Sequence, residues 1–156
     1  MNVSRIDHVG VTVSDVERAL HFYRDTLGLR VVNDSVFTSP EVAALLGLES
    51  IELRSVDLDS GDGRVFELLH YVRPEGNHID YESRDPATGH IALTVDDLEA
   101  VRGRIEAGGG RVISSAELHI SDPGGAFDGA ICLYVRDPDG MILELVQRPV
   151  RAPNSR

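Results

Sequence analysis

The chain has 156 residues, of which 42% are hydrophobic, and its 26 acidic residues against 15 basic ones leave a formal net charge of −11. This length suits one domain of ordinary size. The acidic excess argues against nucleic acid or anionic membrane surfaces as partners. No apolar run approaches the ~20 residues of a membrane span or forms the hydrophobic region of a signal peptide. We therefore expect a cytoplasmic protein whose single cysteine, Cys132, is a buried strand residue.

The first half of the chain predicts a strand, a helix and three further strands, with a short helix inserted among them. Residues 5–13 alternate as a half-buried strand does, and Ser14 and Asp15 can cap the helix that follows. Apolar residues recur at helical spacing until Gly28 stops this helix. The remaining predicted elements are the strand LRVV (29–32), a helix opened by Ser39, Pro40 and Glu41 and ended by Gly47, and strands near 50–58 and 64–72.

The second half repeats this order after a polar connection. Residues 73–87 contain two prolines and no hydrophobic period, which is typical of a linker. A strand at 88–95, a helix at 97–107 and strands at 111–118, 129–136 and 141–148 are predicted to follow, the last two joined by the turn DPDG. We therefore expect one domain made of module one (5–72), the linker (73–87) and module two (88–149), ending in a frayed tail (150–156).

The two halves also carry matching polar residues. IDHVGVTVSDVERA and GHIALTVDDLEAV align at an offset of 82 positions that pairs His8 with His90, and RVFELL and MILELV contain Glu67 and Glu144. Taken singly, each would be a hydrogen-bonded imidazole or an exposed strand carboxylate. At equivalent positions of an internal repeat, they predict that a pseudo-twofold axis brings all four side chains to one divalent metal ion.

The charge and number of these ligands suit a catalytic metal site. Two neutral imidazoles and two carboxylates balance a 2+ charge and leave two positions of an octahedral shell open for water or a bidentate oxygen substrate. A closed structural zinc site usually uses thiolates, which this sequence lacks.

These segments, together with VRDPDGMILELV, resemble the vicinal oxygen chelate superfamily of glyoxalases, bleomycin-resistance proteins and extradiol dioxygenases over residues 5–149. The resemblance implies an α+β fold in which two paired βαβββ modules form an open, cup-shaped mixed sheet with helices outside. It also implies a homodimer and a metal held by His8, Glu67, His90 and Glu144. This ligand pattern is most similar to glyoxalase I and methylmalonyl-CoA epimerase. Thr12 and Tyr71 stand where bacterial glyoxalase I has the arginine and asparagine that hold glutathione.

The function implied by this resemblance is that of an isomerase, epimerase or lyase. It would use one divalent ion (Ni, Co, Mn, Fe or Zn) to bind a small molecule through two oxygens and to stabilise an enolate. Glu144 is the first candidate to move the proton, with Glu67 as its partner.

Two alternatives remain. An Fe(II) extradiol dioxygenase would use His8, His90 and Glu144 as a facial triad, and the fourth candidate ligand argues against it. A non-enzymatic protein of the same fold would sequester an antibiotic or another ligand. The complete set of four candidate ligands favours catalysis over sequestration.

Overall fold

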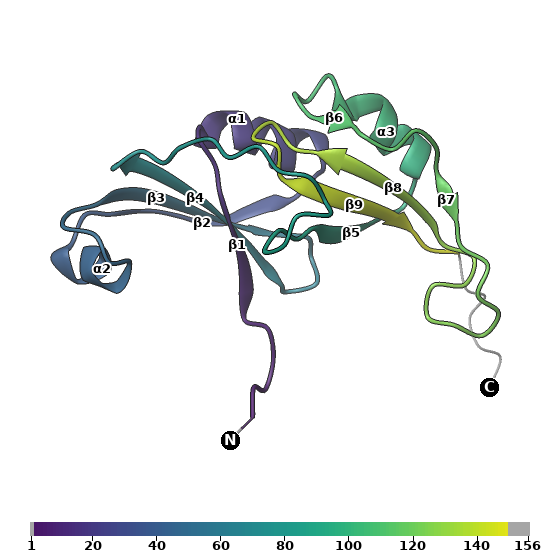
Figure 1. Cartoon of the computed structure of the whole chain (residues 1–156), viewed down its shortest axis with the longest axis horizontal. Coiled ribbons are helices and arrows are strands. Elements are labelled where there is room, and N and C mark those ends of the chain that lie inside the picture. Colours follow the sequence, from purple (N-terminus) through teal and green to yellow (C-terminus); the bar gives the residue numbers. More distant parts are fainter. Residues whose placement is uncertain (1, 150–156) are drawn as a thin grey trace. The chain divides into compact units, whose positions relative to one another are not determined.

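The computed structural model describes residues 2–149 and divides the chain into two compact units (Figure 1). Unit 1 is Met1–Ile79 and unit 2 is Asp80–Arg156, so the boundary falls inside the predicted linker 73–87. The predicted tail 150–156 lies outside the described residues. Each unit contains one mixed sheet together with helices, which confirms the α+β fold class.

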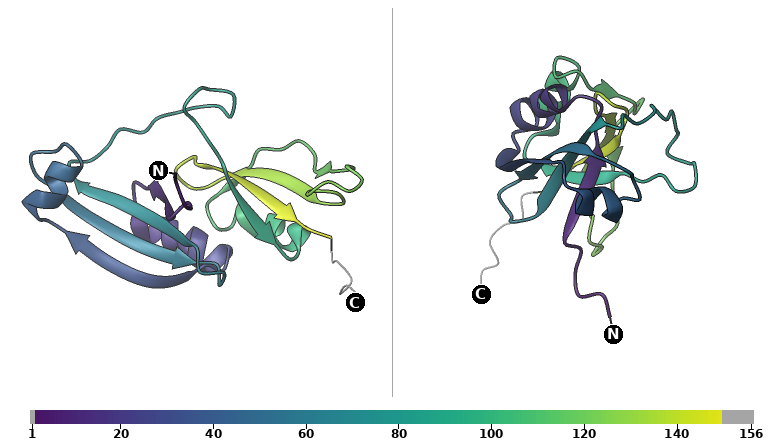
Figure 2. Two further views of the ribbon diagram at one scale, coloured as in Figure 1. Left: turned by 90° about the horizontal axis from the view of Figure 1, so that it is seen from below. Right: turned by 90° about the vertical axis from the view of Figure 1, so that its left-hand side faces the viewer.

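Unit 1 has the predicted order of elements. They are β1 (His8–Thr12), α1 (Val16–Leu20), η1 (His21–Thr26), β2 (Arg30–Phe37), α2 (Pro40–Leu45), β3 (Glu52–Asp59) and β4 (Val65–Arg73). The sheet order is β1-β4-β3-β2, in which β1 runs parallel to β4 and the other neighbours are antiparallel. Figure 2 shows α1 and η1 along one face of this sheet.

The first helix differs from the continuous α-helix that the spacing predicts. Asp15 caps it as expected, because its Oδ1 accepts from the backbone N–H groups of Glu17 (2.9 Å) and Arg18 (3.0 Å). From His21 onward the backbone is π-helical, and the Thr26 hydroxyl donates to the His21 carbonyl at 3.2 Å. The helix ends before Gly28, whose φ of +82° is a conformation that glycine adopts without steric cost.

The core of unit 1 lies between α1–η1 and one face of the sheet. Its largest fully buried side chains are those of Phe22, Tyr23, Val56, Leu58 and Leu68. Because side chains alternate along a strand, the residues between these core positions face the other side of the sheet. Helix α2, capped by Ser39 as predicted, packs Ala43 near Ile51 and Leu53.

Unit 2 repeats the topology with mostly shorter strands. Its elements are β5 (Ile91–Val95), α3 (Leu98–Ile105), β6 (Arg111–Val112), β7 (Leu118–His119), β8 (Ile131–Arg136) and β9 (Ile142–Gln147). The order is β5-β9-β8-β6, with β7 also pairing with β8 and with β5 parallel to β9. Helix α3, capped by Asp97, buries Leu98, Val101 and Ile105 and contacts β8 and β9.

The single strand predicted at 111–118 is wrong, because the structure has two short strands there. Ile113 N and Ser114 N both donate to the Tyr134 carbonyl, and the Ser114 hydroxyl accepts from Tyr134 N at 2.8 Å. These contacts interrupt the hydrogen-bond ladder with β8 over the residues between β6 and β7. None of the helices within residues 2–149 has both the length and the hydrophobicity needed to span a bilayer.

Candidate metal site

In unit 1 the structure brings His8 and Glu67 together. The parallel register of β1 and β4 places Gly10 opposite Glu67 and His8 opposite Val65, so all of these residues share one face of the sheet. His8 Nε2 lies 3.6 Å from Glu67 Oε2. The imidazole is half-exposed, whereas the carboxylate is 22% exposed. Unit 1 thus supplies one nitrogen and one oxygen ligand side by side.

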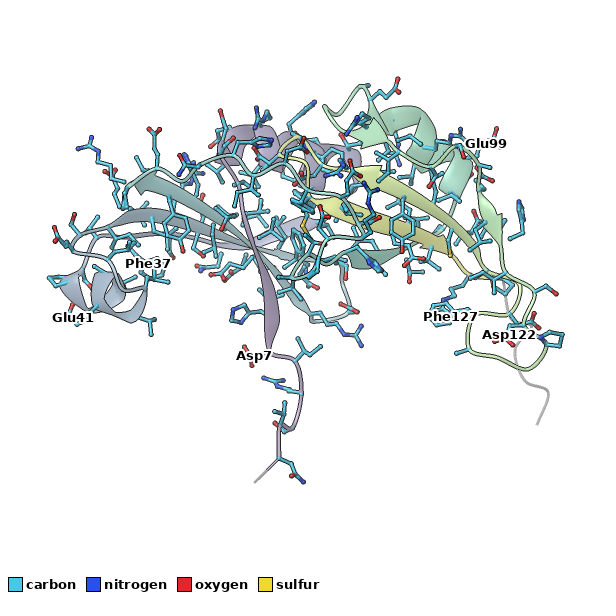
Figure 3. All side chains as sticks on the ribbon, in the orientation of Figure 1. Asp7, Phe37, Glu41, Glu99, Asp122 and Phe127 are labelled. Carbon is cyan, nitrogen blue, oxygen red and sulfur yellow. The ribbon has the colours of Figure 1, made fainter. Side chains whose placement is uncertain are left out.

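The other nitrogen of His8 has its own partner. Asp7, labelled in Figure 3 at the start of β1, places Oδ1 3.3 Å from His8 Nδ1. This contact and the neighbouring Arg5 guanidinium lower the pKa of the Asp7 carboxyl. When the ring proton is on Nδ1 it donates to Asp7, and Nε2 then carries the lone pair that is available to a metal. A carboxylate behind a histidine in this way fixes the tautomer that binds a metal.

Glu67 is held from the neighbouring strand. The Ser55 hydroxyl, in a residue only 2% exposed, donates to Glu67 Oε1 at 2.7 Å. Asp57 stands directly opposite Glu67 across β3 and β4, and its Oδ2 accepts from Asn33 Nδ2 at 3.2 Å. The glutamate therefore has one oxygen bonded to Ser55 and the other directed at His8.

In unit 2 the structure brings His90 and Glu144 together. His90 Nε2 lies 3.2 Å from Glu144 Oε2 and 3.3 Å from the Tyr134 hydroxyl. His90 immediately precedes β5 and so lies outside the strand that was predicted to contain it, because the ladder with β9 begins at Ile91 opposite Leu143. Burial, and then the charge of Glu144, raise the pKa of the Tyr134 phenol, which is therefore a neutral hydroxyl at physiological pH.

Cys132 lies on the same face of the second sheet as Glu144. It pairs with Val146, two residues after Glu144, and is 3% exposed, as predicted for a strand thiol. Burial raises the pKa of this thiol, and a hydrogen bond to Glu144 raises it further. Cys132 is therefore a protonated, weak donor beside the carboxylate.

The Nε2–Oε2 separations of the two pairs can be compared with those of two ligands on one metal ion. Ligands that lie about 2.1 Å from one ion, at octahedral or tetrahedral angles, are about 3.0–3.4 Å apart. The separation in unit 2 is within that range and the separation in unit 1 is slightly above it. Among residues 2–149, no group of three or more His, Cys, Asp or Glu side chains is placed to hold an ion. Each unit thus brings together one candidate histidine and one candidate glutamate, and the four-ligand site remains a prediction.

A hollow in unit 2 lies away from the histidine–glutamate pair of that unit. It is lined by residues of α3 and its neighbours, including Asp97, Arg102 and Glu117. It also reaches Gln147, whose side chain points to the opposite face of β9 from Glu144. This hollow therefore does not belong to the candidate site.

Residues 5–145 match the sequence model of the Glyoxalase/Bleomycin resistance protein/Dioxygenase superfamily. The chain belongs to this superfamily. It is 31% identical over 149 residues to a probable lactoylglutathione lyase of Vibrio cholerae, covering 94% of this chain and 93% of that one. It is 29% identical over 147 residues to an ethylmalonyl-CoA/methylmalonyl-CoA epimerase of Cereibacter sphaeroides, covering 93% and 98% of the two chains.

The fold is also that of solved superfamily structures. A glyoxalase family protein from Bacillus cereus superposes with a TM-score of 0.81 over 95% of this chain and 96% of that one, at 17% identity. At this identity the likeness establishes the fold only. The relatives named above are, by their names, a lyase and an epimerase.

Sequence reasoning missed the residues that surround the four candidate ligands. Asp7 adjoins His8 in the chain, so this partner could have been proposed from the sequence. Ser55 reaches Glu67 only through the register of β3 with β4, and Tyr134 reaches His90 only through the registers of β8 and β5 with β9. No local signal predicts these registers.

Proposed function

We propose that this protein is a divalent-metal-dependent isomerase, epimerase or lyase whose metal ligands are His8, Glu67, His90 and Glu144. The proposal depends on one observation. In each unit the same parallel strand pair places an imidazole Nε2 within 3.6 Å of a glutamate Oε2. Two equivalent pairs with identical ligand types are what a single ion with two His and two Glu ligands requires. The ion is of the Ni, Co, Mn, Fe or Zn class.

When bound, such an ion would act as a Lewis acid toward two oxygens of a small substrate and favour the enolate of its carbonyl group. The chain itself supplies the proton transfer. Glu144 is the proposed base, taking the proton from the carbon beside the carbonyl while the C–H electron pair moves toward the carbonyl oxygen. Glu67 is its proposed partner, and Glu144 returns the proton to the same or a neighbouring carbon.

The phenol of Tyr134 stands next to this base and stays protonated. It is therefore suited to donate a hydrogen bond to a substrate oxygen that gains negative charge. The buried thiol of Cys132 is too weak a donor and too little exposed to act as a nucleophile.

The relatives suggest the class of substrate. The names of the two relatives include lactoylglutathione and methylmalonyl-CoA. Both compounds are thioesters with a carbon acid next to a carbonyl. Tyr71, at a position used for glutathione in the bacterial lyases that the sequence resembles, packs here against the apolar cluster of Ala43, Ile51 and Leu53. We therefore propose a small carbon acid as substrate. The experiment below tests whether a glutathione adduct is also a substrate.

The experiment measures exchange of substrate C–H protons with solvent. Protein stripped of metal and reloaded separately with each of the five ions is incubated in D₂O with the hemithioacetal of methylglyoxal and glutathione, with methylmalonyl-CoA, or with a 2-hydroxyketone. Proton NMR then detects deuterium incorporation, which reports proton abstraction by a lyase, an isomerase or an epimerase alike. We expect exchange with at least one compound, abolished in Glu144→Gln while that variant still binds metal.

Other results would overturn the proposal. A wild-type chain that binds no divalent ion at micromolar concentration contradicts it. Oxygen consumption by the Fe(II) form with a catechol would instead establish the dioxygenase alternative. Tight binding of a ligand by the metal-free protein, without exchange, would establish sequestration. The predicted homodimer is tested separately by light scattering after gel filtration.

A further inference from the structure

The two candidate glutamates have different hydrogen-bond donors at equivalent positions. In unit 1, Ser55 pairs with Leu69, two residues after Glu67. In unit 2, Cys132 pairs with Val146, two residues after Glu144. The two sheets have the same local arrangement at this point. In each, the residue lies on the antiparallel neighbouring strand and is diagonal to the glutamate. Ser55 and Cys132 are thus counterparts that differ by one atom, oxygen for sulfur.

Ser55 makes a short, sheltered hydrogen bond. Its hydroxyl lies 2.7 Å from Glu67 Oε1, and the residue is 2% exposed in the middle of β3. A hydroxyl that donates to a carboxylate makes one of the stronger hydrogen bonds found in proteins. Since Oε1 is bonded in this way, Oε2 is the oxygen left facing His8 at 3.6 Å.

Glu67 is also confined from the opposite side. A β-carbon added at Gly10 would lie 3.3 Å from Glu67 Oε2, so the carboxylate lies close to the space that a side chain on β1 would fill. The counterpart of Gly10 is Ala92, opposite Glu144 on β9, which carries a β-carbon. The counterpart position in unit 2 thus accepts a β-carbon, whereas a β-carbon at position 10 would be in tight contact with Glu67.

Glu144 is held by weaker or shared donors. A thiol such as Cys132 donates a much weaker hydrogen bond than a hydroxyl. The Tyr134 phenol also faces Glu144, but it lies 3.3 Å from His90 Nε2 and has a single proton to give. The position on β8 that corresponds to Ser55 therefore offers Glu144 only a thiol.

We propose that Ser55 is a positioning residue that holds Glu67 as a fixed metal ligand, and that cysteine at the counterpart position leaves Glu144 as the carboxylate free to move a proton. This inference rests on the proposed function, since it assigns different duties to two ligands of the same site. It predicts that the donor at position 55 controls metal affinity and that the donor at position 132 controls turnover.

The test exchanges the two donors and uses Co²⁺ as the probe. The variants are Ser55→Ala, Ser55→Cys, Cys132→Ala and Cys132→Ser, and Co²⁺ affinity is measured by calorimetry and by the visible absorption of the bound ion. Loss of a hydrogen bond to a metal ligand typically weakens metal binding by about 10–100-fold. We expect a loss in that range for Ser55→Ala, a smaller loss for Ser55→Cys, and a change below about twofold for Cys132→Ala.

Cys132→Ser gives Glu144 the donor that Glu67 has. We expect this variant to bind Co²⁺ at least as tightly as the wild type, with a shifted absorption band, and to exchange substrate protons several-fold more slowly. A role in folding alone would not produce tighter binding together with slower exchange. Circular dichroism tests whether each variant is folded. If Ser55→Ala unfolds, Ser55→Cys, which nearly preserves the side-chain volume, is compared with the wild type in its place.

The failures are distinguishable. If the wild type binds no Co²⁺, the proposed function is wrong. If the wild type binds Co²⁺ but Ser55→Ala and Ser55→Cys bind it within about twofold of wild type, this inference is overturned and the proposed function stands. Equal losses in Ser55→Ala and Cys132→Ala would also overturn it, because the two donors would then be equivalent.

Discussion

Gly10 and Glu67 face each other across β1 and β4 at a separation that would bring a β-carbon on residue 10 into tight contact with the glutamate. A β-carbon at position 10 would lie 3.3 Å from Glu67 Oε2 and 3.3 Å from the Leu69 side chain. Both separations are tighter than ordinary van der Waals contacts. The close approach of the carboxylate therefore favours glycine here, since Gly10 has no unusual backbone angle that would favour it.

Gly10→Ala is therefore expected to displace the Glu67 carboxylate from His8. Because a misplaced ligand typically costs metal affinity by about tenfold or more, Co²⁺ binding should weaken by at least that factor. Calorimetric titration measures the change. Ala92→Gly is the matched control on β5, where the counterpart position already accepts a β-carbon. Unchanged Co²⁺ affinity in Gly10→Ala would show that Glu67 adapts without loss.

Asp34→Asn should make stability less sensitive to acid. Arg54 donates to both Asp34 oxygens, at 2.9 and 2.8 Å, and also to Glu17 at 2.7 Å. The hydrogen bond from Arg54 lowers the pKa of Asp34 below its ordinary value of 3.8. The lowered pKa means that this stabilisation is complete well above pH 3.8 and is lost as the pH falls through the folded-state value.

We expect Asp34→Asn to be less stable than wild type by about 0.5–1 kcal/mol at neutral pH, since the pair is largely exposed. The difference should shrink between neutral pH and a pH below 3.8, because the stabilisation is lost as the pH falls through the lowered folded-state pKa of Asp34. Urea unfolding at both pH values measures it, and Glu75→Gln, an exposed acid of the same unit, serves as the control. A difference that stayed constant with pH would mean that the charge of Asp34 contributes nothing.

Arg136→Met should release the segment that leads into unit 2. The buried Arg136 guanidinium donates to the carbonyls of Gly140 (2.7 Å) and Tyr81 (2.5 Å) and lies over the Tyr81 ring. Removing these bonds leaves two carbonyls without this donor, at a cost of about 1–3 kcal/mol. We expect faster tryptic cleavage after Arg84, detected by mass spectrometry. Arg111 is an exposed arginine opposite Arg136, and trypsin should cleave the Arg111→Met variant after Arg84 at the wild-type rate.

Leu133→Ala should destabilise unit 2. Leu133 is fully buried on the face of β8 that α3 covers. Truncating such a leucine costs about 2–5 kcal/mol, depending on how far the surrounding side chains relax. Urea unfolding followed by circular dichroism measures the loss. The partly exposed Ile113 provides the comparison, and Ile113→Ala should cost less than about 1.5 kcal/mol.

The order of elements and the four candidate ligands could be predicted from the sequence. Strand alternation, the capping residues Asp15 and Asp97, and the turn residues Gly28 and DPDG are local signals, so they predict local structure. The constant offset of the repeat is enough by itself to match His8 with His90. In the folded chain each of these histidines lies beside the glutamate of its own half.

Only the tertiary structure decided what surrounds those pairs. The division of residues 111–118 into two short strands depends on hydrogen bonds to Tyr134, some 20 residues away in the chain. The contacts of Ser55 with Glu67 and of Tyr134 with His90 depend on strand register. A shift of one residue would move the side chains of the shifted strand to the other face of the sheet. Local patterns determined which residues carry the chemistry. The pairing of distant strands determined which donor holds each carboxylate, because hydrogen bonds form between neighbours in space.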